Sequence, residues 1–343
     1  MNKFTRILTC VVCTILIGNL HAQQQRKVDI DETFIAQRAD PQITRGKDGT
    51  YYFIATVPEY DRIEIRKSKT LHGLKSAEAV VIWRKHHTGA MGNHIWAPEL
   101  HEIDGDWYIY FAAGSAEHKW NIRKYVLSNT SADPTTGVWK EEGELQSKRN
   151  EFSLDATTFE HTGDRYLVWV DRASQDVPNT GLYIAKMLSP TKLDDKQVVI
   201  SQPEYAWEIK GHRVNEGPAV LIRNGKIFMT FSASATDANY CIGLLWADAQ
   251  ADLLDPASWH KLDSPVFFSH EGLKRFGPGH NSFTTDEKGR DVMVYHARDY
   301  KDIDGEPLYD PNRHTRIRVL QWTKDGMPDF GQEFSDADFS KKK

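Results

Sequence analysis

The sequence predicts an all-β fold, a five-bladed β-propeller whose four-stranded antiparallel blades surround a central channel. Two observations support this prediction. A short hairpin-forming unit occurs five times at intervals of about 60 residues, which is enough for the four strands of one blade. Turn signals such as Asn224-Gly225 separate the β-rich runs within these units.

Each unit opens with a short strand, continues through a turn and returns along an apolar strand. The opening segments begin at Asp40, Ala97, Asp155, Gly217 and Asn281. A two-stranded hairpin cannot bury both of its faces, so neighbouring units must pack radially. The opening strands are then expected to line the channel. The returning strands are expected at residues 50–55, 107–111, 166–170, 227–232 and 292–296.

The remaining segments fit outer strands and connections. Residues 62–68 alternate apolar and charged side chains, as a half-solvated strand does, and residues 79–83 complete the first blade. The segment 86–96, rich in Gly and His, is expected at the channel mouth. Matching Asp-Pro…Trp turns end the second and fourth blades, at residues 133–139 and 255–259. We expect a propeller domain at 37–334, preceded by an N-terminal segment (23–36) that packs on the last blade, and a polar, frayed tail at 335–343.

Residues 1–22 have the pattern of a signal peptide, which predicts an exported protein, periplasmic or extracellular. Lys3 and Arg6 precede the apolar run 7–17, and a small-residue cleavage site follows at Ala22. The run is too short for a transmembrane helix. Cys10 and Cys13 would leave with this segment; a lipoprotein anchor at Cys13 is a poorly matched alternative.

Composition narrows the function classes. The 343 residues are 40% hydrophobic and 27% charged, as in a soluble globular protein with a sizeable core. A formal net charge of -5 without a Lys/Arg stripe argues against nucleic-acid binding. Cys241, the one cysteine beyond the leader, lies in a strand pattern and is expected to be a buried, inert thiol. Stability must therefore come from packing and not from a disulfide framework.

Three acids, Asp40, Asp155 and Glu216, stand at the start of equivalent strands in separate units. A turn cap or solvated strand end would explain one such acid, but three at equivalent positions favour a shared site in the channel. Two carboxyls can hydrolyse a glycosidic bond: one protonates the leaving oxygen, and the other activates water or attacks the sugar. A third can raise the pKa of the acid and orient it.

With these acids, further motifs make residues 37–331 resemble glycoside hydrolase family 43. The resemblance implies a five-bladed propeller that hydrolyses arabinofuranosides or xylosides with inversion. It implies Asp40 as general base, Glu216 as general acid and Asp155 as the residue that tunes pKa and orientation. Inversion requires a water between acid and base, hence carboxyls roughly 6.5–9.5 Å apart. The motifs are Asp40-Pro41, Ile95-Trp96-Ala97-Pro98-Glu99-Leu100-His101, Asp155-Ala156-Thr157-Thr158-Phe159, Glu216-Gly217-Pro218-Ala219 and Gly277-Pro278-Gly279-His280-Asn281.

Other residues receive weaker assignments. Trp96 is a candidate sugar-stacking platform or a core tryptophan, and His94 and Glu99 are candidate lining residues. Arg298 would pair with an active-site carboxylate or would lie at a strand end as a charge on the surface.

Metal binding depends on His280. It resembles the family histidine on the channel axis, which in some members helps to hold a structural calcium ion through water; the alternative is a hydrogen-bonded histidine without metal. The resemblance implies no required cofactor. Catalytic zinc is disfavoured, since no metal-ligand spacing joins His86, His87, His94 and His101.

The resulting hypothesis is an exo-acting α-L-arabinofuranosidase that removes terminal arabinofuranosyl residues from plant polysaccharide side chains or oligosaccharides. Its partner would be an arabinose- or xylose-containing oligosaccharide or polysaccharide, with no nucleic acid and no membrane span. Alternatives are a β-xylosidase or endo-arabinanase on the same scaffold, a retaining fructan-type propeller with carboxyls ~5–5.5 Å apart, and a non-catalytic sugar-binding propeller. The loops at 86–96, 171–180 and 202–215 would decide the sugar and the linkage.

Overall fold

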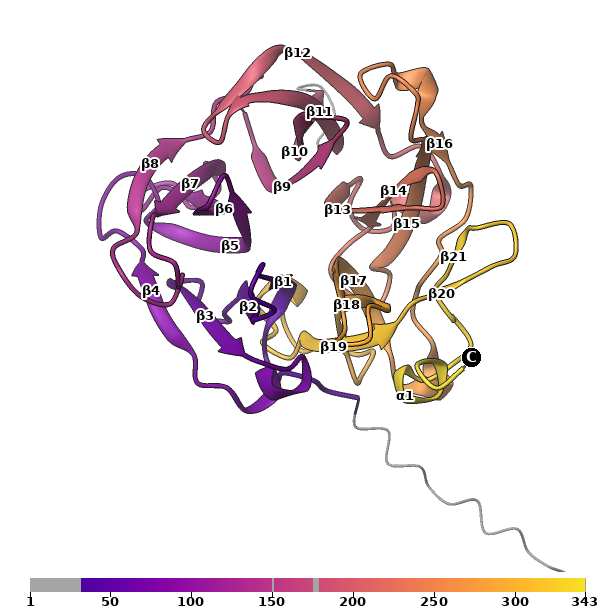
Figure 1. Ribbon diagram of the computed structural model, residues 1–343. Helices are drawn as coiled ribbons and strands as arrows, with labels where there is room; N and C mark the ends of the chain where they lie inside the picture. Colours follow the sequence, from indigo (N-terminus) through magenta and orange to yellow (C-terminus); the bar gives the residue numbers. More distant parts are fainter. Residues whose placement is uncertain (1–31, 150, 175–178, 343) are drawn as a thin grey trace, which may run out of the picture. The chain divides into compact units, whose positions relative to one another are not determined.

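Five antiparallel sheets follow one another along the chain and are arranged as a ring in the computed structural model (Figure 1). The structure describes residues 32–149, 151–174 and 179–342; the predicted signal peptide lies outside these residues. Residues 31–343 form one compact unit. The five-bladed propeller predicted from the repeat is confirmed.

In each of the five sheets the first strand in sequence is the innermost. The first two sheets contain β1 (Ala39–Arg45), β2 (Tyr51–Thr56), β3 (Arg62–Ser68) and β4 (Val80–Arg84), then β5 (Asn93–Ile103), β6 (Asp106–Gly114), β7 (Arg123–Asn129) and β8 (Lys140–Glu144). The next two contain β9 (Ser153–His161), β10 (Asp164–Ser174), β11 (Asn179–Ser189) and β12 (Lys192–Ser201), then β13 (Asn215–Arg223), β14 (Lys226–Ala233), β15 (Cys241–Asp248) and β16 (His260–Lys261). The fifth contains β17 (Phe276–Thr285), β18 (Asp291–Arg298) and β19 (His314–Val319), and a small hairpin of β20 (Gln321–Trp322) and β21 (Pro328–Asp329) follows.

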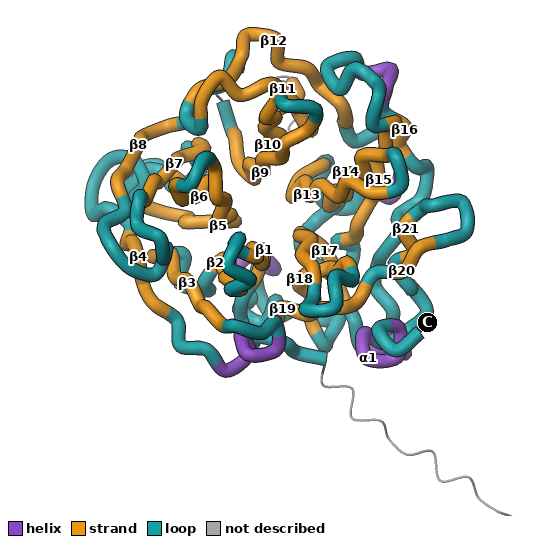
Figure 2. Tube along the Cα trace, in the orientation of Figure 1, coloured by secondary structure: helices purple, strands orange, loops and turns teal. Residues whose placement is uncertain are grey.

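Helices in the described residues are short (Figure 2). The longest, with five residues, follows β3 in the first blade. They are the 3-10 turns η1 (His72–Ser76), η2 (Ala206–Glu208), η3 (Pro256–Ser258), η4 (Glu271–Leu273) and η5 (Pro307–Tyr309), and α1 (Asp336–Phe339).

The repeat has a clear backbone counterpart, a bulge at the same place in every inner strand. The register with the second strand shifts at this point in all five blades. One residue at each bulge has a left-handed backbone, and these residues are Asp40, Ala97, Asp155, Gly217 and His280, with φ between 42° and 54°. Left-handed φ is costly for residues other than glycine, and such strain concentrates at functional sites. The three acids therefore lie at or next to these strained bulges.

Glycine is favoured at one of these bulges. At Gly217 φ is +54°, and an added Cβ would lie 3.0 Å from Cγ of His280. The absence of a side chain therefore lets β13 approach β17 closely, which brings the residue before it, Glu216, next to the strand that carries His280.

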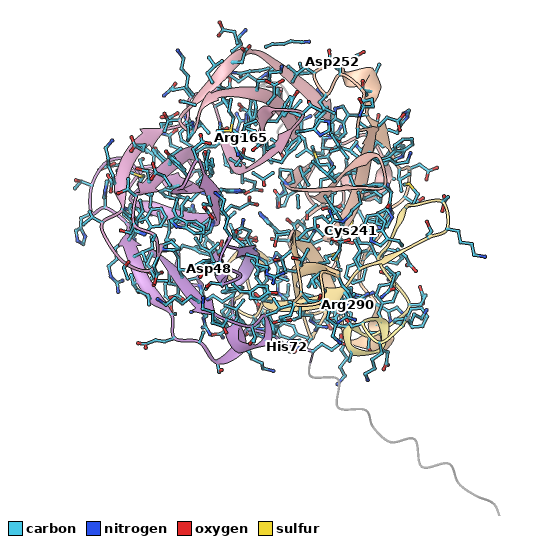
Figure 3. All side chains as sticks on the ribbon, in the orientation of Figure 1. Asp48, His72, Arg165, Cys241, Asp252 and Arg290 are labelled. Atoms are coloured by element: carbon cyan, nitrogen blue, oxygen red, sulfur yellow. The ribbon has the colours of Figure 1, made fainter. Side chains whose placement is uncertain are left out.

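Apolar packing between the blades stabilises the ring. Trp169 of β10, for example, is fully buried in a cluster that also contains Tyr110 and Val126 of the preceding blade. Burial of one such large side chain contributes about 1.5–3 kcal/mol. Cys241 of β15 (Figure 3) is buried, and burial raises the pKa of its thiol to about 12, as expected for an inert cysteine.

The ring closes through the N-terminal segment. Phe34 and Ile35 are buried, and Ile35 forms a β-bridge with Thr315 of β19, the outer strand of the last blade. The expected packing of this segment on the last blade is therefore seen for its described part.

The C-terminal tail is not frayed, contrary to the expectation from its polar composition. Ser335 caps α1, and Asp336 accepts hydrogen bonds from Arg318 (2.5 Å) and Tyr295 (2.9 Å). Phe339 is fully buried. The expectation failed because a buried ion pair and one aromatic side chain anchor a segment that is otherwise polar.

Candidate active site

A pocket of about 570 Å³ opens at the N-terminal ends of the inner strands. Its lining includes the three predicted acids together with Trp96 and His280. A second cavity of about 410 Å³ lies at the C-terminal ends of the same strands, so the two occupy opposite ends of the channel. The bulges therefore turn residues from several blades toward one end of the channel.

Asp40 is buried and lies among hydrogen-bond donors and basic side chains. Its carboxylate accepts a hydrogen bond from Thr56 (2.6 Å) and lies 3.4 Å from both Nδ1 of His280 and the guanidinium of Arg313. Burial favours the neutral carboxyl, but His280 and Arg313 outweigh it and lower the pKa of Asp40 to about 2. Asp40 is therefore an ionised carboxylate throughout the range in which the protein is expected to work.

Glu216 has the opposite character. It lies at the pocket and accepts a hydrogen bond from the hydroxyl of Tyr240 (2.7 Å). Burial and the neighbouring Asp155 raise its pKa above the ordinary value. Burial likewise raises the pKa of Asp155, and Asp40 adds to this effect. Glu216 thus retains a proton at higher pH than a free glutamic acid.

Asp155 and His280 connect these two carboxyls. Oδ2 of Asp155 accepts a hydrogen bond from the backbone of Gly217 (2.9 Å), the residue after Glu216, and lies 4.0 Å from Nδ1 of His280. Burial opposes the charge on His280, but the surrounding carboxylates raise its pKa, with Asp40 as the largest contributor. The carboxylates at this end of the channel therefore lie beside two basic side chains, His280 and Arg313.

Tyr240 links the acid to the strand behind the base. Its ring stacks on His296 with centroids 5.7 Å apart, and His296 accepts a hydrogen bond from the backbone N–H of Asp40 (3.0 Å). Burial and Arg313 lower the pKa of His296 well below its ordinary value, so the ring is neutral. The stacked pair of Tyr240 and His296 thus contacts both Glu216 and the backbone of Asp40.

Replacing Tyr240 with phenylalanine should shift the alkaline limb of the activity profile to higher pH. The hydroxyl donates to Glu216 and favours its ionised form, so loss of this donor raises the pKa of Glu216 further. The measurement is the pH dependence of kcat/KM for the two proteins. A limb that moved to lower pH would contradict the assignment of this carboxyl.

Of the three residues expected to line or floor the sugar site, only Trp96 lines the pocket. Trp96 lines the pocket, but it is 8% exposed. His94 stacks behind it with centroids 4.2 Å apart and does not line the pocket. Glu99 lines the cavity at the other end of the channel and contacts His101 at 2.9 Å.

Arg298 does not pair with any of the three acids. It is buried and contacts Asp310 (3.0 Å) and the carbonyl oxygens of Thr236 and Pro307 (2.7 Å each). It therefore fixes the η5 loop, whose Leu308 and Tyr309 line the pocket. The arginine that contacts Asp40 is Arg313, so both readings of Arg298, as an active-site partner and as a surface charge, are wrong.

Sequence reasoning missed Arg313, Tyr240 and Trp120. Arg313 and Tyr240 are buried groups whose role depends on strand register across blades. Trp120 lies in a loop between β6 and β7, outside the repeated unit, and its 51% exposure makes it the more accessible aromatic surface at the pocket. The local sequence distinguishes none of them from core or surface residues.

The described side chains at the channel axis do not form a direct calcium site. In the described parts of the chain, no group of three or more His, Cys, Asp or Glu side chains is arranged to hold a metal ion. Nδ1 of His280 faces Asp40 and Asp155. Calcium binding through water at His280 stays a prediction.

Comparison with known proteins identifies the family of this chain. The model of glycosyl hydrolases family 43 matches residues 31–328. The chain belongs to this family. The match covers nearly all of the residues that the structure describes.

Several relatives that are similar to this chain over most of its length are named as arabinofuranosidases. The chain is 50% identical over 340 residues to an extracellular exo-α-(1→5)-L-arabinofuranosidase of Streptomyces avermitilis, covering 98% of this chain and 71% of that protein. It is 52% identical over 306 residues to α-L-arabinofuranosidase 43 of Humicola insolens, covering 89% and 63%. The crystal structure of an α-L-arabinofuranosidase from Lactobacillus brevis superposes with a TM-score of 0.85 at 48% identity, covering 88% and 96%. The chain thus spans about two thirds of the two curated relatives and nearly all of the solved structure.

Proposed function

We propose that this family 43 glycosidase is an exo-acting α-L-arabinofuranosidase. The observation that carries the proposal is the opposite pKa shift of two carboxyls in one pocket, lowered for Asp40 and raised for Glu216. Such a pair is what hydrolysis of a glycosidic bond requires. The names of the two relatives and of the Lactobacillus brevis structure support arabinofuranose as the sugar.

The carboxyls would act in a single displacement. Protonated Glu216 donates its proton to the glycosidic oxygen as the bond to the anomeric carbon breaks. Ionised Asp40 removes a proton from a water molecule, whose oxygen attacks the anomeric carbon from the opposite face. The sugar leaves with inverted configuration, and Asp155 keeps the pKa of Glu216 raised through its nearby charge.

Exo action is supported by the loop around η5. Leu308 and Tyr309 line the pocket, and the hydroxyl of Tyr60 donates to the carbonyl of Leu308. Tyr309 also accepts a hydrogen bond from Lys119 (3.0 Å), a residue of the second blade. A wall fixed from two blades suits a terminal sugar better than a continuous chain, which an endo-arabinanase must bind.

The proposal is tested with paired aryl α-L-arabinofuranoside and β-D-xyloside substrates. We expect turnover of the arabinoside with kcat/KM well above that of the xyloside. NMR of the product formed from an arabinofuranosyl disaccharide should show the β-anomer first, as inversion requires. Preferred turnover of the xyloside would replace the proposal with a β-xylosidase, and first release of the α-anomer would exclude the inverting mechanism.

We also propose that the enzyme is exported. The signal-peptide pattern at residues 1–22 and the extracellular assignment in the name of the Streptomyces avermitilis relative support this. In the described residues, no helix is long and apolar enough to cross a membrane. Fractionation of expressing cells, followed by N-terminal sequencing of the exported protein, would test both the compartment and the cleavage site.

A further inference from the structure

The side of the pocket next to Glu216 carries two arginines. Arg172 and Arg213 both line the pocket, and among the residues that the structure describes no ion pair joins either guanidinium to a carboxylate. Some other arginines do have a carboxylate partner, for example Arg223 with Asp291 (2.6 Å) and Arg290 with Asp286 (2.8 Å). The whole chain, in contrast, has a formal net charge of -5.

Three neighbouring strand ends place these arginines together. Arg172 of β10 is the cross-strand partner of Thr180 in β11. The backbone N–H of Thr180 donates to the carbonyl of Arg213 (3.2 Å), and Thr180 forms a parallel bridge with Val214. The two arginines therefore flank one residue on the third and fourth blades.

This position is on the leaving-group side of the scissile bond. A general acid must contact the glycosidic oxygen, so the leaving group lies beside Glu216. Arg213 precedes Glu216 by three residues, a separation of at most about 10 Å along extended chain. The candidate base, Asp40, comes from the first blade. Two cations thus lie within reach of whatever sugar follows the terminal arabinofuranose.

We infer that the leaving-group side of this pocket recognises a carboxylate, which makes an arabinofuranoside attached to a uronic acid a preferred substrate. The inference rests on the proposed function and specifies its substrate. A neutral sugar offers only hydroxyls to two guanidinium groups, whereas a uronate offers a charged, planar partner that arginine binds through paired hydrogen bonds. Besides the three catalytic candidates, the lining residues contain one carboxylate, Glu306, against the two arginines on the leaving-group side.

The test compares two disaccharides that differ in one charge. Both carry an α-L-arabinofuranosyl group, one on galacturonate and the other on the methyl ester of the same uronic acid. At low salt and a pH near 6, we expect kcat/KM of the wild-type enzyme to favour the free acid by about tenfold or more, the effect of one charge-assisted hydrogen bond. The preference should decrease as salt screens the charges.

Variants assign the preference to the two arginines. In the double variant Arg172→Gln/Arg213→Gln, the ratio of the two kcat/KM values should fall close to one. Arg165→Gln is a matched control, because Arg165 (Figure 3) lies on the same strand β10 but is not among the residues that line the pocket, and it should keep the wild-type ratio. The use of a ratio makes the result independent of any general loss of activity.

The outcomes separate this inference from the proposed function. Equal kcat/KM for acid and ester in the wild-type enzyme, or a preference that persists in the double variant, would overturn the inference while arabinosidase activity stands. Failure of the wild-type enzyme to hydrolyse either disaccharide or an aryl α-L-arabinofuranoside would overturn the proposed function and the inference with it.

Discussion

Glu216→Gln is expected to reduce hydrolysis of unactivated arabinofuranosyl disaccharides by about 10²–10⁴-fold, the usual contribution of a general acid. The amide cannot donate a proton to the departing oxygen. The leaving sugar must then depart as an alkoxide or take its proton from solvent, and both routes are slow. Aryl arabinosides should lose much less activity, because a phenolate leaves without protonation. The measurement is kcat/KM for both substrate types in the variant and the wild-type enzyme.

A matched control separates chemistry from folding. Glu204 lies on the connection that leads to the same blade, is largely exposed and contacts Lys261 at 3.6 Å. Glu204→Gln should keep wild-type kcat/KM on both substrates. Equal losses on aryl and disaccharide substrates in Glu216→Gln would contradict the role of general acid.

The same substitution should not destabilise the fold, and above neutral pH it should stabilise it. The raised pKa of Glu216 means that folding favours its protonated form. That contribution is fully present below the pKa of the unfolded state and is lost as pH rises through the folded-state pKa, because a charge must then remain buried. Glutamine removes this cost, so Tm should match wild type near pH 5 and exceed it near pH 9.

The fold could be predicted because the repeat is local in sequence. Asp40, Ala97, Asp155 and Gly217 were recognised as equivalent positions, and each of them occupies the left-handed bulge of an inner strand. In the last blade the bulge falls on His280, one residue before the predicted start at Asn281. Turn signals and apolar runs identify such hairpins, and radial packing follows from their unburied faces.

The partners of the acids could not be predicted in the same way. Arg298 and Arg313 both belong to the last blade, yet only the latter reaches Asp40, and the difference depends on the path of the loop between β18 and β19. Tyr240 precedes β15, and its hydroxyl contacts Glu216 of β13 although strand β14 lies between β13 and β15. Contacts of this kind are set by register and loop geometry, which residue types alone do not encode.

Asp40→Asn is expected to have the second large effect, a loss of about 10²–10⁴-fold in kcat/KM on every arabinoside, aryl substrates included. The attacking water still needs a base when the leaving group is good. This pattern differs from that of Glu216→Gln, so the two variants assign the two roles independently. Full activity of Asp40→Asn on aryl arabinosides would contradict its role as general base.

The stability of Asp40→Asn should change in the direction opposite to that of Glu216→Gln. Because the pKa of Asp40 is lowered from 3.8 to about 2, its charge stabilises the fold by ~2 kcal/mol above pH 4, and this contribution is lost as pH falls through the folded-state value. The asparagine variant also leaves Arg313 and His280 without their shared anion. Tm at pH 6 should therefore fall by several degrees, and the difference from wild type should narrow toward pH 3.

Asp104 supplies the control for the backbone at this position. Both aspartates have left-handed φ, 51° for Asp40 and 53° for Asp104, and asparagine tolerates this conformation. Asp104 is exposed in a turn, so Asp104→Asn should leave Tm unchanged. An Asp40→Asn variant as stable as wild type at pH 6 would mean that the cations around Asp40 do not hold its charge. The low pKa, and with it the assignment of Asp40 as the ionised partner of Glu216, would then be wrong.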